Sequence, residues 1–342
     1  MPDAIVIGGG QSGLAAAHAL REAGLKPVVL EAGAEPVGSW PRYYDSLTLF
    51  SPAGYSSLPG KRFPGDPRHY PVRDEVVAYL RDYAAGLDVD IRTGHRVESV
   101  RHNGNFVVRA GEEFEVPVVV AASGWFGKPH TPALPGLESF AGKVIHAADY
   151  REPSAFAGQR IVVVGAGNSG VQIAAELAEV ALVTLATRRP VRYAPQRPLG
   201  KDLQFWFSVT GVAYLPRRIK GEPPTVPVID TGHYRGLIRA GQPDRRPMFT
   251  RLDGNHVVWS DGHREPVDTL LLATGYRPDM PYLDGLGALD GRGVPKHRRG
   301  VSTSVPGLGY VGLEWQSTLV SASLRGVGRD ARYVVRKLAP MR

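Results

Sequence analysis

Two stretches of the chain share one pattern of apolar and polar positions. Each opens with a short unbroken apolar run, Ala4–Ile7 and Ile161–Val164, of the kind that forms a strand buried on both faces. A glycine-rich turn follows, and then a segment with the apolar periodicity of a helix, marked in the second stretch by Ile173, Leu177 and Val180. A further apolar run closes each stretch. The pattern therefore predicts two βαβ units, one at the start of the chain and one near its middle.

The turns of both units have the spacing G-x-G-x-x-G. The glycines are Gly8, Gly10 and Gly13 in the first unit and Gly165, Gly167 and Gly170 in the second. In this motif the first glycine permits a tight turn, the second lets the backbone approach a pyrophosphate, and the third lets the helix pack closely on the strand. Each turn therefore predicts a dinucleotide site, to which we also assign the residues between the glycines, Gln11, Ser12, Asn168 and Ser169.

The two units differ in charge at one matched position. Glu31 stands eighteen residues after the last glycine of the first unit, whereas Arg188, followed by Arg189, stands eighteen residues after the last glycine of the second. A carboxylate there accepts hydrogen bonds from a free ribose 2′-hydroxyl, and an arginine pair favours a 2′-phosphate. The first unit is therefore predicted to bind FAD or NAD, and the second NADPH.

Two later apolar strands are separated by nearly the same number of residues as the two glycine turns. Val116–Ala122 ends in Ser123-Gly124, and Leu270–Ala273 ends in Thr274-Gly275, 151 residues on, close to the 157 residues between the two glycine turns. We expect an α/β fold with two Rossmann-like, three-layer domains, the NADPH domain being inserted into the FAD domain. The expected boundaries are 1–150 with 276–342 for FAD, and 151–275 for NADPH.

Weaker patterns predict the remaining elements. Val72–Ala85 has the periodicity of an amphipathic helix, and residues 88–108 alternate as in a small antiparallel sheet. Near the C-terminus we expect a strand through Tyr310 and Val311 and a helix from about Thr318.

The amino-acid composition excludes several kinds of functional site and of location. The 342 residues contain no cysteine, which excludes disulfides, a C-x-x-C redox pair and zinc–thiolate sites, and we expect no metal site. No apolar run approaches the roughly 20 residues of a membrane span. The chain enters its first strand within three residues, with no basic region or cleavage site before it, so we expect no signal peptide. We therefore expect a cytoplasmic protein that is not bound to a membrane.

The net charge of +8 raises the question of nucleic-acid binding. The excess is concentrated in Arg188–Arg251, where thirteen basic residues face four acidic ones. Attraction of an anionic cofactor explains such a segment equally well, and no nucleic-acid-binding motif is visible. We expect no nucleic-acid partner.

The segment between the units carries a further motif. Phe140–Tyr150, FAGKVIHAADY, resembles the F-x-G-x-x-x-H-x-x-x-(W/Y/F) motif of class B flavoprotein monooxygenases, and Gly38-Ser39-Trp40 fits the same family. The resemblance covers nearly the whole chain. It implies FAD and NADPH as cofactors, and O₂ and a small molecule as the substrates. It also implies oxygenation of a soft nucleophile, a sulfide or an amine, through a C4a-(hydro)peroxyflavin.

Two positions depart from the family pattern. Many flavin-containing monooxygenases have an Asn-Thr-Pro segment beside the flavin, whereas the matching stretch here puts Phe50 and Ser51 before Pro52. Tyr150 replaces the Trp common in Baeyer–Villiger enzymes, which favours heteroatom oxidation. The chain is most similar to small bacterial members with an L-F-S-P-A-G segment, some of which also accept NADH, so NADH is the alternative reductant.

The resemblance completes the set of candidate site residues. The catalytic candidates are Phe50, Ser51 and His146, and the further cofactor-binding candidates are Trp40, Val97, Thr274, Gly275 and Gln316. Three other functions stay open: a flavoprotein reductase that passes electrons to a carrier or quinone, Baeyer–Villiger oxidation of ketones, and a non-catalytic redox sensor. The sequence also leaves open whether the chain forms a homodimer.

Overall fold

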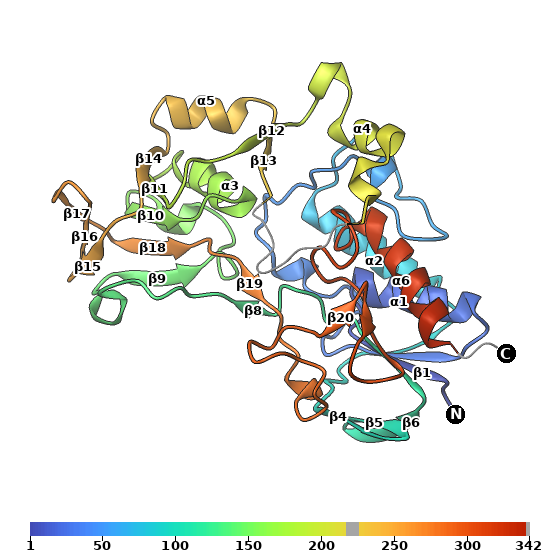
Figure 1. Ribbon diagram of the computed structural model, residues 1–342. Helices are drawn as coiled ribbons and strands as arrows, with labels where there is room; N and C mark the ends of the chain where they lie inside the picture. The colour runs from blue at the N-terminus through green and yellow to red at the C-terminus, as the bar shows by residue number, and fades with distance from the viewer. Residues whose placement is uncertain (217–225, 340–342) are drawn as a thin grey trace.

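The computed structural model describes residues 1–216 and 226–339 and contains two lobes (Figure 1). Residues 217–225, part of the basic segment noted above, lie outside the described residues. Within the described part, no helix has both the length and the apolar character needed to cross a membrane. The cytoplasmic location stays a prediction.

The first lobe is built on a sheet with the strand order β20-β21-β22-β7-β1-β2-β3. The strands from β22 to β3 are parallel, and β20 and β21 extend the sheet in antiparallel fashion. Their bounds are β1 Ala4–Ile7, β2 Pro27–Leu30, β3 Asp90–Arg92, β7 Val118–Ala121, β20 His297–Arg298, β21 Val301–Ser302 and β22 Leu308–Tyr310.

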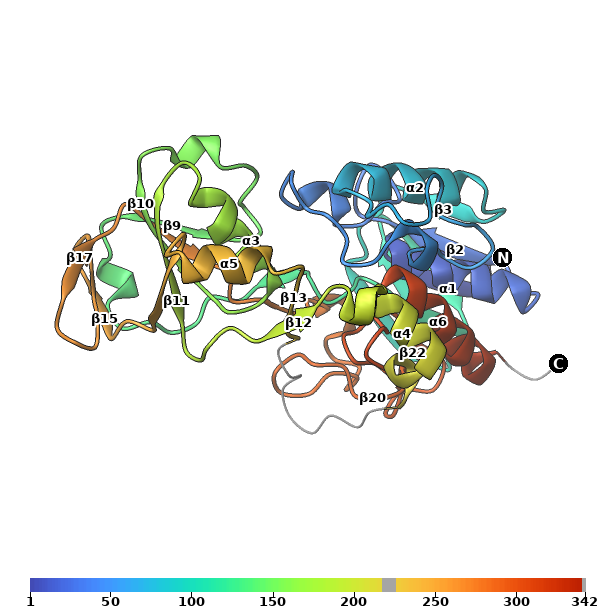
Figure 2. The ribbon, with the colours of Figure 1, turned by 90° about the horizontal axis from the view of Figure 1, so that it is seen from above.

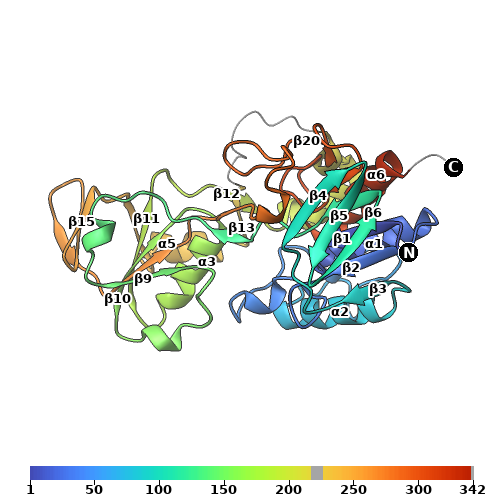
Figure 3. The ribbon, with the colours of Figure 1, turned by 90° about the horizontal axis from the view of Figure 1, so that it is seen from below.

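Alternate residues of β1 pack into different layers. Ala4 and Val6 belong to the core under the helices α1 (Gln11–Glu22), α2 (Arg73–Ala85) and α6 (Leu324–Leu338). Ile5 and Ile7 instead join the core under an antiparallel sheet on the opposite face (Figure 3). The strands of that sheet are β4 Ser99–Asn103, β5 Asn105–Ala110 and β6 Glu112–Val116. The first unit is thus a three-layer domain.

The second lobe repeats this plan. Its parallel sheet has the order β14-β11-β10-β18-β9, with helices α3 and α5 packed on one face and an antiparallel sheet on the other. The bounds are β9 Lys143–His146, β10 Arg160–Val164, α3 Asn168–Leu177, β11 Leu182–Thr187, α5 His233–Arg239, β14 Asp244–Pro247, β15 Arg251–Asp253, β16 His256–Val258, β17 Arg264–Pro266 and β18 Thr269–Leu272. The expected fold class, an α/β protein with two Rossmann-like domains, is confirmed.

The two parallel sheets differ in the origin of one strand. In the first sheet the position beyond β7 is taken by β22, from the end of the chain, whereas the matching position beyond β18 is taken by β9, which precedes the second unit. The expected division at residue 150 assigned Lys143–His146 to the first domain, but its hydrogen bonds lie in the second sheet. A short edge strand without an apolar run gives no sign of which sheet it joins.

The chain crosses between the lobes at several places. Strands β8 (Lys128–Pro129) and β19 (Tyr276–Arg277) pair antiparallel at the junction, and β12 (Tyr193–Pro195) pairs with β13 (Val228–Asp230) in a separate parallel ribbon. Helix α4 (Leu203–Thr210) extends from this ribbon to lie beside α6 of the first lobe (Figure 2). Short 3₁₀ turns occupy Trp40–Arg42, Ala53–Tyr55, Leu137–Ser139, Ser154–Phe156, Pro198–Gly200, Val212–Tyr214 and Pro281–Leu283.

Three expected elements differ from the structure. The last helix begins at Leu324 and not near Thr318, because the Ser321 hydroxyl accepts the backbone N–H groups of Ser317 and Thr318 and holds that segment in a turn. Residues 90–92 form the parallel strand β3, so only the later part of 88–108 is antiparallel. Helix α3 ends at Leu177, which leaves Val180 outside it and exposed.

Candidate functional site

The first glycine turn lies between β1 and α1 and has no room for side chains at its outer glycines. Gly8 has a φ of +105°, and a Cβ on Gly13 would lie 1.7 Å from the Gly8 carbonyl oxygen. A Cβ on Gly10 would lie 3.2 Å from Gly38 Cα, so the loop that carries Gly38 closes over the turn. Because these positions carry no side chains, the turn offers only backbone groups at the start of α1, as a pyrophosphate site requires.

The Glu31 carboxylate is fixed at the end of β2. Glu31 is buried, and its Oε2 accepts the Gly9 N–H at 2.5 Å while Oε1 accepts the Gly33 N–H at 2.6 Å. Each carboxylate oxygen has a second lone pair, so both can still accept a ribose hydroxyl. The structure thus places Glu31 against the first turn, and its role at a ribose stays a prediction.

The second glycine turn, between β10 and α3, resembles the first but has an open centre. A Cβ on Gly165 would lie 2.3 Å from the Ala273 carbonyl oxygen, and one on Gly170 would lie 2.9 Å from the Gly165 carbonyl oxygen. A Cβ on Gly167 would meet no atom of the described residues within 4 Å. The outer glycines thus serve packing, and the middle one faces free space.

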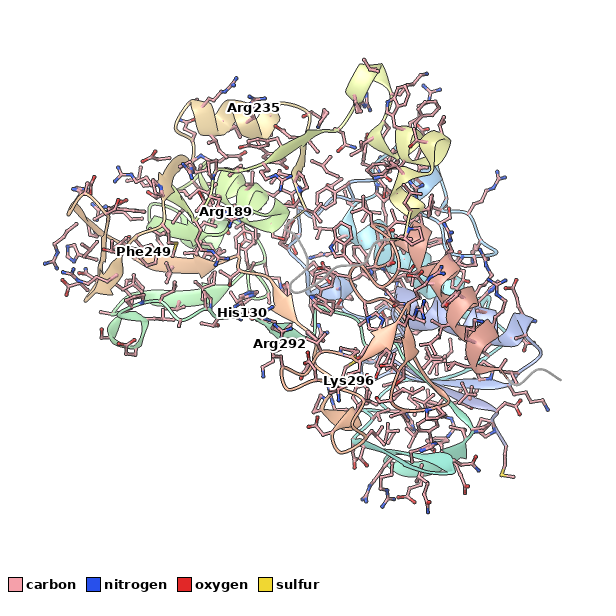
Figure 4. All side chains as sticks on the ribbon, viewed as in Figure 1. His130, Arg189, Arg235, Phe249, Arg292 and Lys296 are labelled. Atoms are coloured by element: carbon pink, nitrogen blue, oxygen red, sulfur yellow. The ribbon has the colours of Figure 1, made fainter. Side chains whose placement is uncertain are left out.

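Arg188 and Arg189 follow directly after β11, and both are exposed. Figure 4 labels Arg189 beside α3 and Arg235 on α5. Arg245 reaches the same strand end, since its Nε donates to Thr187 Oγ1 at 2.9 Å. Sequence reasoning missed Arg245, because β14 is polar throughout and only its pairing with β11 places it here.

Three segments meet at the start of α1. Trp40 Nε1 donates to Gln11 Oε1 at 3.2 Å, and Gln11 Nε2 donates to the Ala322 carbonyl at 2.6 Å. Ser12 is buried so close to Gly312 that a Cβ on that glycine would lie 2.0 Å from Ser12 Oγ. The structure therefore brings the first turn, the loop at Trp40 and the C-terminal segment together.

Gln316 lies in that C-terminal segment with an unsatisfied amide. It is buried, and its Oε1 accepts the Leu313 N–H at 3.3 Å, whereas Nε2 has no hydrogen-bond partner among the described residues. A buried donor left unpaired costs about 1–3 kcal/mol. This amide therefore fits a bound group that offers an acceptor. Val97, by contrast, is buried in the core under the antiparallel sheet.

Phe50 and Ser51 are half-buried in the loop before the 3₁₀ turn at Ala53. The Ser51 and Ser56 hydroxyl oxygens lie 2.8 Å apart. The Phe50 carbonyl accepts a hydrogen bond of 3.1 Å from Nε2 of Gln196, a buried residue that follows β12. The second lobe thus holds the backbone of the Phe50 segment through Gln196, which the sequence did not indicate.

Both ring nitrogens of His146 face backbone groups. Nδ1 accepts the Ala148 N–H at 3.0 Å, so Nε2 carries the proton and donates to the Gly275 carbonyl at 3.1 Å. Burial lowers the pKa of His146, and the bond to Gly275 opposes this shift. In this arrangement the neutral imidazole fixes the turn after β18 and leaves no nitrogen free for proton transfer.

The remaining predicted residues lie in the second turn or directly after β18. Asn168 Oδ1 accepts the Ile229 N–H at 3.1 Å and so ties the turn to the β12–β13 ribbon. Ser169 is exposed, near the Tyr44 hydroxyl. Thr274 Oγ1 donates to the His130 carbonyl at 2.5 Å.

A row of aromatic rings joins the two lobes and was not predicted. Trp40 meets Tyr43 edge to face at 5.5 Å between centroids, Tyr43 meets Phe126 at 6.3 Å, and Phe126 meets Tyr276 at 5.2 Å. Tyr276 meets the His146 ring at 5.1 Å. The row runs from the loop beside the first turn to the strand end beside the second, so it is an apolar wall at the junction.

Comparison with known proteins agrees with this arrangement. The profile of the family described as pyridine nucleotide-disulphide oxidoreductase matches residues 5–208. An uncharacterized CzcO-like oxidoreductase of Geobacillus kaustophilus is 34% identical, over 97% of each chain. The indole-3-pyruvate monooxygenase YUCCA1 of Oryza sativa is 31% identical, over 82% of this chain and 78% of its own.

A solved structure is similar over the same length. The flavin-containing monooxygenase of Stenotrophomonas maltophilia is 34% identical, with a TM-score of 0.87 over 98% of each chain. Relatives of this kind imply a flavin and a nicotinamide dinucleotide as cofactors and flavin-dependent monooxygenase activity. Since both dinucleotide turns are also formed, the chain belongs to the pyridine nucleotide-disulphide oxidoreductase family and is an oxidoreductase of the flavin-containing monooxygenase type.

Proposed function

We propose that this enzyme is an NADPH-dependent FAD monooxygenase that oxygenates a sulfide or an amine. The observation that carries the proposal is the opposite charge at one position of two otherwise matched units, Glu31 in the first and Arg188 with Arg189 in the second. For a sulfide the reaction is NADPH + H⁺ + O₂ + R₂S → NADP⁺ + H₂O + R₂SO. One oxygen atom enters the product, and the other leaves as water.

The first unit fits FAD. The bare backbone at Gly10 would face the pyrophosphate, the Glu31 carboxylate would accept the ribose hydroxyls, and the unpaired Gln316 amide would donate to an acceptor of the bound group. FAD supplies hydride acceptance and activation of O₂ when it is bound. The protein then has to orient the reactants and exclude water.

The second unit fits NADPH. An uncrowded Gly167 lets the pyrophosphate approach the start of α3. Arg188 and Arg189 would bind the 2′-phosphate, and Arg245, held by Thr187 at the same strand end, adds a third guanidinium. NADH lacks that phosphate, so these arginines favour NADPH.

Other residues maintain the junction between the units. Gln196 holds the Phe50 carbonyl, and His146 holds the Gly275 carbonyl. The aromatic row from Trp40 to Tyr276 lines this region with apolar rings. We assign Phe50 and Ser51 to the wall of the reaction site and His146 to positioning. The cofactor performs the bond-making, so no acid–base pair of the protein is required.

A substrate panel tests the proposal. FAD-loaded enzyme is incubated with NADPH, air and, in separate reactions, methyl phenyl sulfide, N,N-dimethylaniline, cyclohexanone and indole-3-pyruvate, the last because of the plant relatives. We expect the sulfoxide or the N-oxide in amounts that follow NADPH consumption. Formation of hydrogen peroxide without an oxygenated product in every reaction would contradict the proposal. Rapid reduction of a quinone under the same conditions would instead support a reductase.

A further inference from the structure

A pocket of about 380 Å³ lies beside α6, and no residue of either glycine turn lines it. One wall is the loop Ser57–Pro59 of the first lobe, and another is Tyr214, which follows α4. The third wall is α6 itself, through Arg325, Arg329 and Arg332. Three guanidinium groups thus line one small concave site that the proposed reaction does not use.

Neutral groups hold the guanidinium of Arg325. Nη1 donates to Gln204 Oε1 at 2.6 Å, Nη2 donates to the Tyr214 hydroxyl at 2.7 Å and to Ser208 Oγ at 3.1 Å, and Nε donates to the same tyrosine at 3.0 Å. These bonds fix the orientation of the side chain without neutralising its charge. The geometry therefore presents a fixed positive charge at the pocket.

Arg329 and Arg332 add two more cations on the same helix face, four and seven residues after Arg325. Both are exposed, and neither makes an ion pair with an acidic side chain of the described residues. The Arg329 guanidinium lies 5.3 Å from the centre of the Tyr214 ring. Like charges at these spacings repel one another, and that repulsion is relieved when an anion binds between them.

We propose that this pocket binds a small organic anion through its phosphate or carboxylate group. Guanidinium groups bind both oxyanions with paired hydrogen bonds. The volume suits a small molecule better than a bare ion, and Leu58 and Pro59 supply an apolar wall for its carbon skeleton. The site does not depend on the proposed monooxygenase reaction.

Arg336 provides a matched control. It continues the same face of α6 one turn further and does not line the pocket. A general attraction of anions to the basic helix would depend on Arg336 as much as on the other arginines, whereas a built site would not. The comparison of Arg329→Gln/Arg332→Gln with Arg336→Gln/Lys337→Gln, which removes the same charge from the same helix outside the pocket, therefore separates the two explanations.

Calorimetric titration of FAD-loaded protein with inorganic phosphate, glycerol 3-phosphate and succinate tests the proposal. We expect one-to-one saturation by an organic anion, an affinity at least about tenfold lower in the Arg329→Gln/Arg332→Gln variant, and a change below about twofold in Arg336→Gln/Lys337→Gln. Stronger binding of glycerol 3-phosphate than of succinate would assign phosphate, and the reverse would assign carboxylate.

Three results would overturn the proposal: no saturation with any probe, binding of inorganic phosphate alone, or equal losses in both variants. Unchanged melting temperatures of the two variants show that lost binding is not lost folding. Loss of the site would leave NADPH-dependent oxygenation unchanged, so its failure is distinguishable from failure of the proposed function.

Discussion

At the scale of single residues, the glycines of the second turn have different tasks. The open space at Gly167 accepts a methyl group, whereas Gly170 faces the Gly165 carbonyl oxygen. We expect Gly167→Ala to fold normally but to raise KM for NADPH about tenfold, because its Cβ enters the space of the pyrophosphate. Gly170→Ala should instead lower the melting temperature. Melting curves and steady-state kinetics check both, and normal cofactor binding by Gly167→Ala would contradict the assignment.

We propose that the exposed pair Arg188 and Arg189, after β11, determines the preference for the reductant. We expect the double variant Arg188→Gln/Arg189→His to raise KM for NADPH at least about 10- to 100-fold, since even one charge-assisted bond to the 2′-phosphate contributes roughly 1.5–3 kcal/mol. KM for NADH should change little, which makes NADH the internal control. Equal increases with both reductants would show that the 2′-phosphate lies elsewhere.

Buried His146 should make stability depend on pH. Its pKa is lowered by burial, so the unfolded chain takes up a proton near the ordinary pKa of 6.5 while the folded chain stays neutral. The resulting stabilisation is complete above pH 6.5 and is lost as the pH falls toward the lower folded pKa, by at most about 1.4 kcal/mol per pH unit.

Urea titrations of wild type and His146→Gln between about pH 5 and pH 7.5 measure this effect. We expect a smaller decline of the unfolding free energy below pH 6.5 in the variant than in wild type. The same change at exposed His263 is the control and should leave the slope as in wild type. Identical slopes in all three proteins would contradict the proposed neutral imidazole.

At the scale of elements, the β12–β13 ribbon connects the two sites. Ile229 of β13 donates to Asn168 in the second turn, and Gln196, directly after β12, donates to the Phe50 carbonyl. Under the proposed function, NADPH bound at the start of α3 would thereby be linked to the segment expected at the reaction centre. The link consists of two hydrogen bonds and one short pair of strands.

Removal of the hydrogen bond from Gln196 to the Phe50 carbonyl should affect the coupling of NADPH oxidation to oxygenation more than it affects folding. We expect Gln196→Leu to increase the share of NADPH electrons lost as hydrogen peroxide about two- to fivefold, because the Phe50 segment is no longer fixed. The variant loses the hydrogen bond to the Phe50 carbonyl and those to Asp202 and Tyr70, each of about 1 kcal/mol. Gln159→Leu, the same change in the second lobe away from the junction, is the control. An unchanged peroxide share in Gln196→Leu would refute its positioning role.

Patterns of neighbouring residues predicted the helices and strands that depend on local sequence alone. The apolar runs at Ala4 and Ile161 and the glycine spacings identified both βαβ units, because burial on two faces requires such runs. The start of α6 was misplaced, since the hydrogen bonds to Ser321 depend on the local conformation and not on apolar periodicity. Arg245 and Gln196 could not be found from sequence, because pairing across distant strands places them.

At the scale of the whole molecule, one plan serves two cofactor sites. Each lobe has a parallel sheet with helices on one face and a small antiparallel sheet on the other (Figure 1). The charge that follows its second strand distinguishes the lobes. The chain enters and leaves the second lobe beside β8 and β19, so both glycine turns are connected to the same junction. This arrangement suits transfer of reducing equivalents from one site to the other.

The measurement that tests the central claim most directly follows the oxygen atoms. FAD-loaded enzyme is supplied with NADPH, a thioether and ¹⁸O₂, and the sulfoxide is analysed by mass spectrometry. We predict one ¹⁸O atom per sulfoxide and close to one sulfoxide per NADPH oxidised. NADPH oxidation that yields only labelled hydrogen peroxide, or a sulfoxide without the label, would contradict the assignment of the two lobes to a single oxygenation.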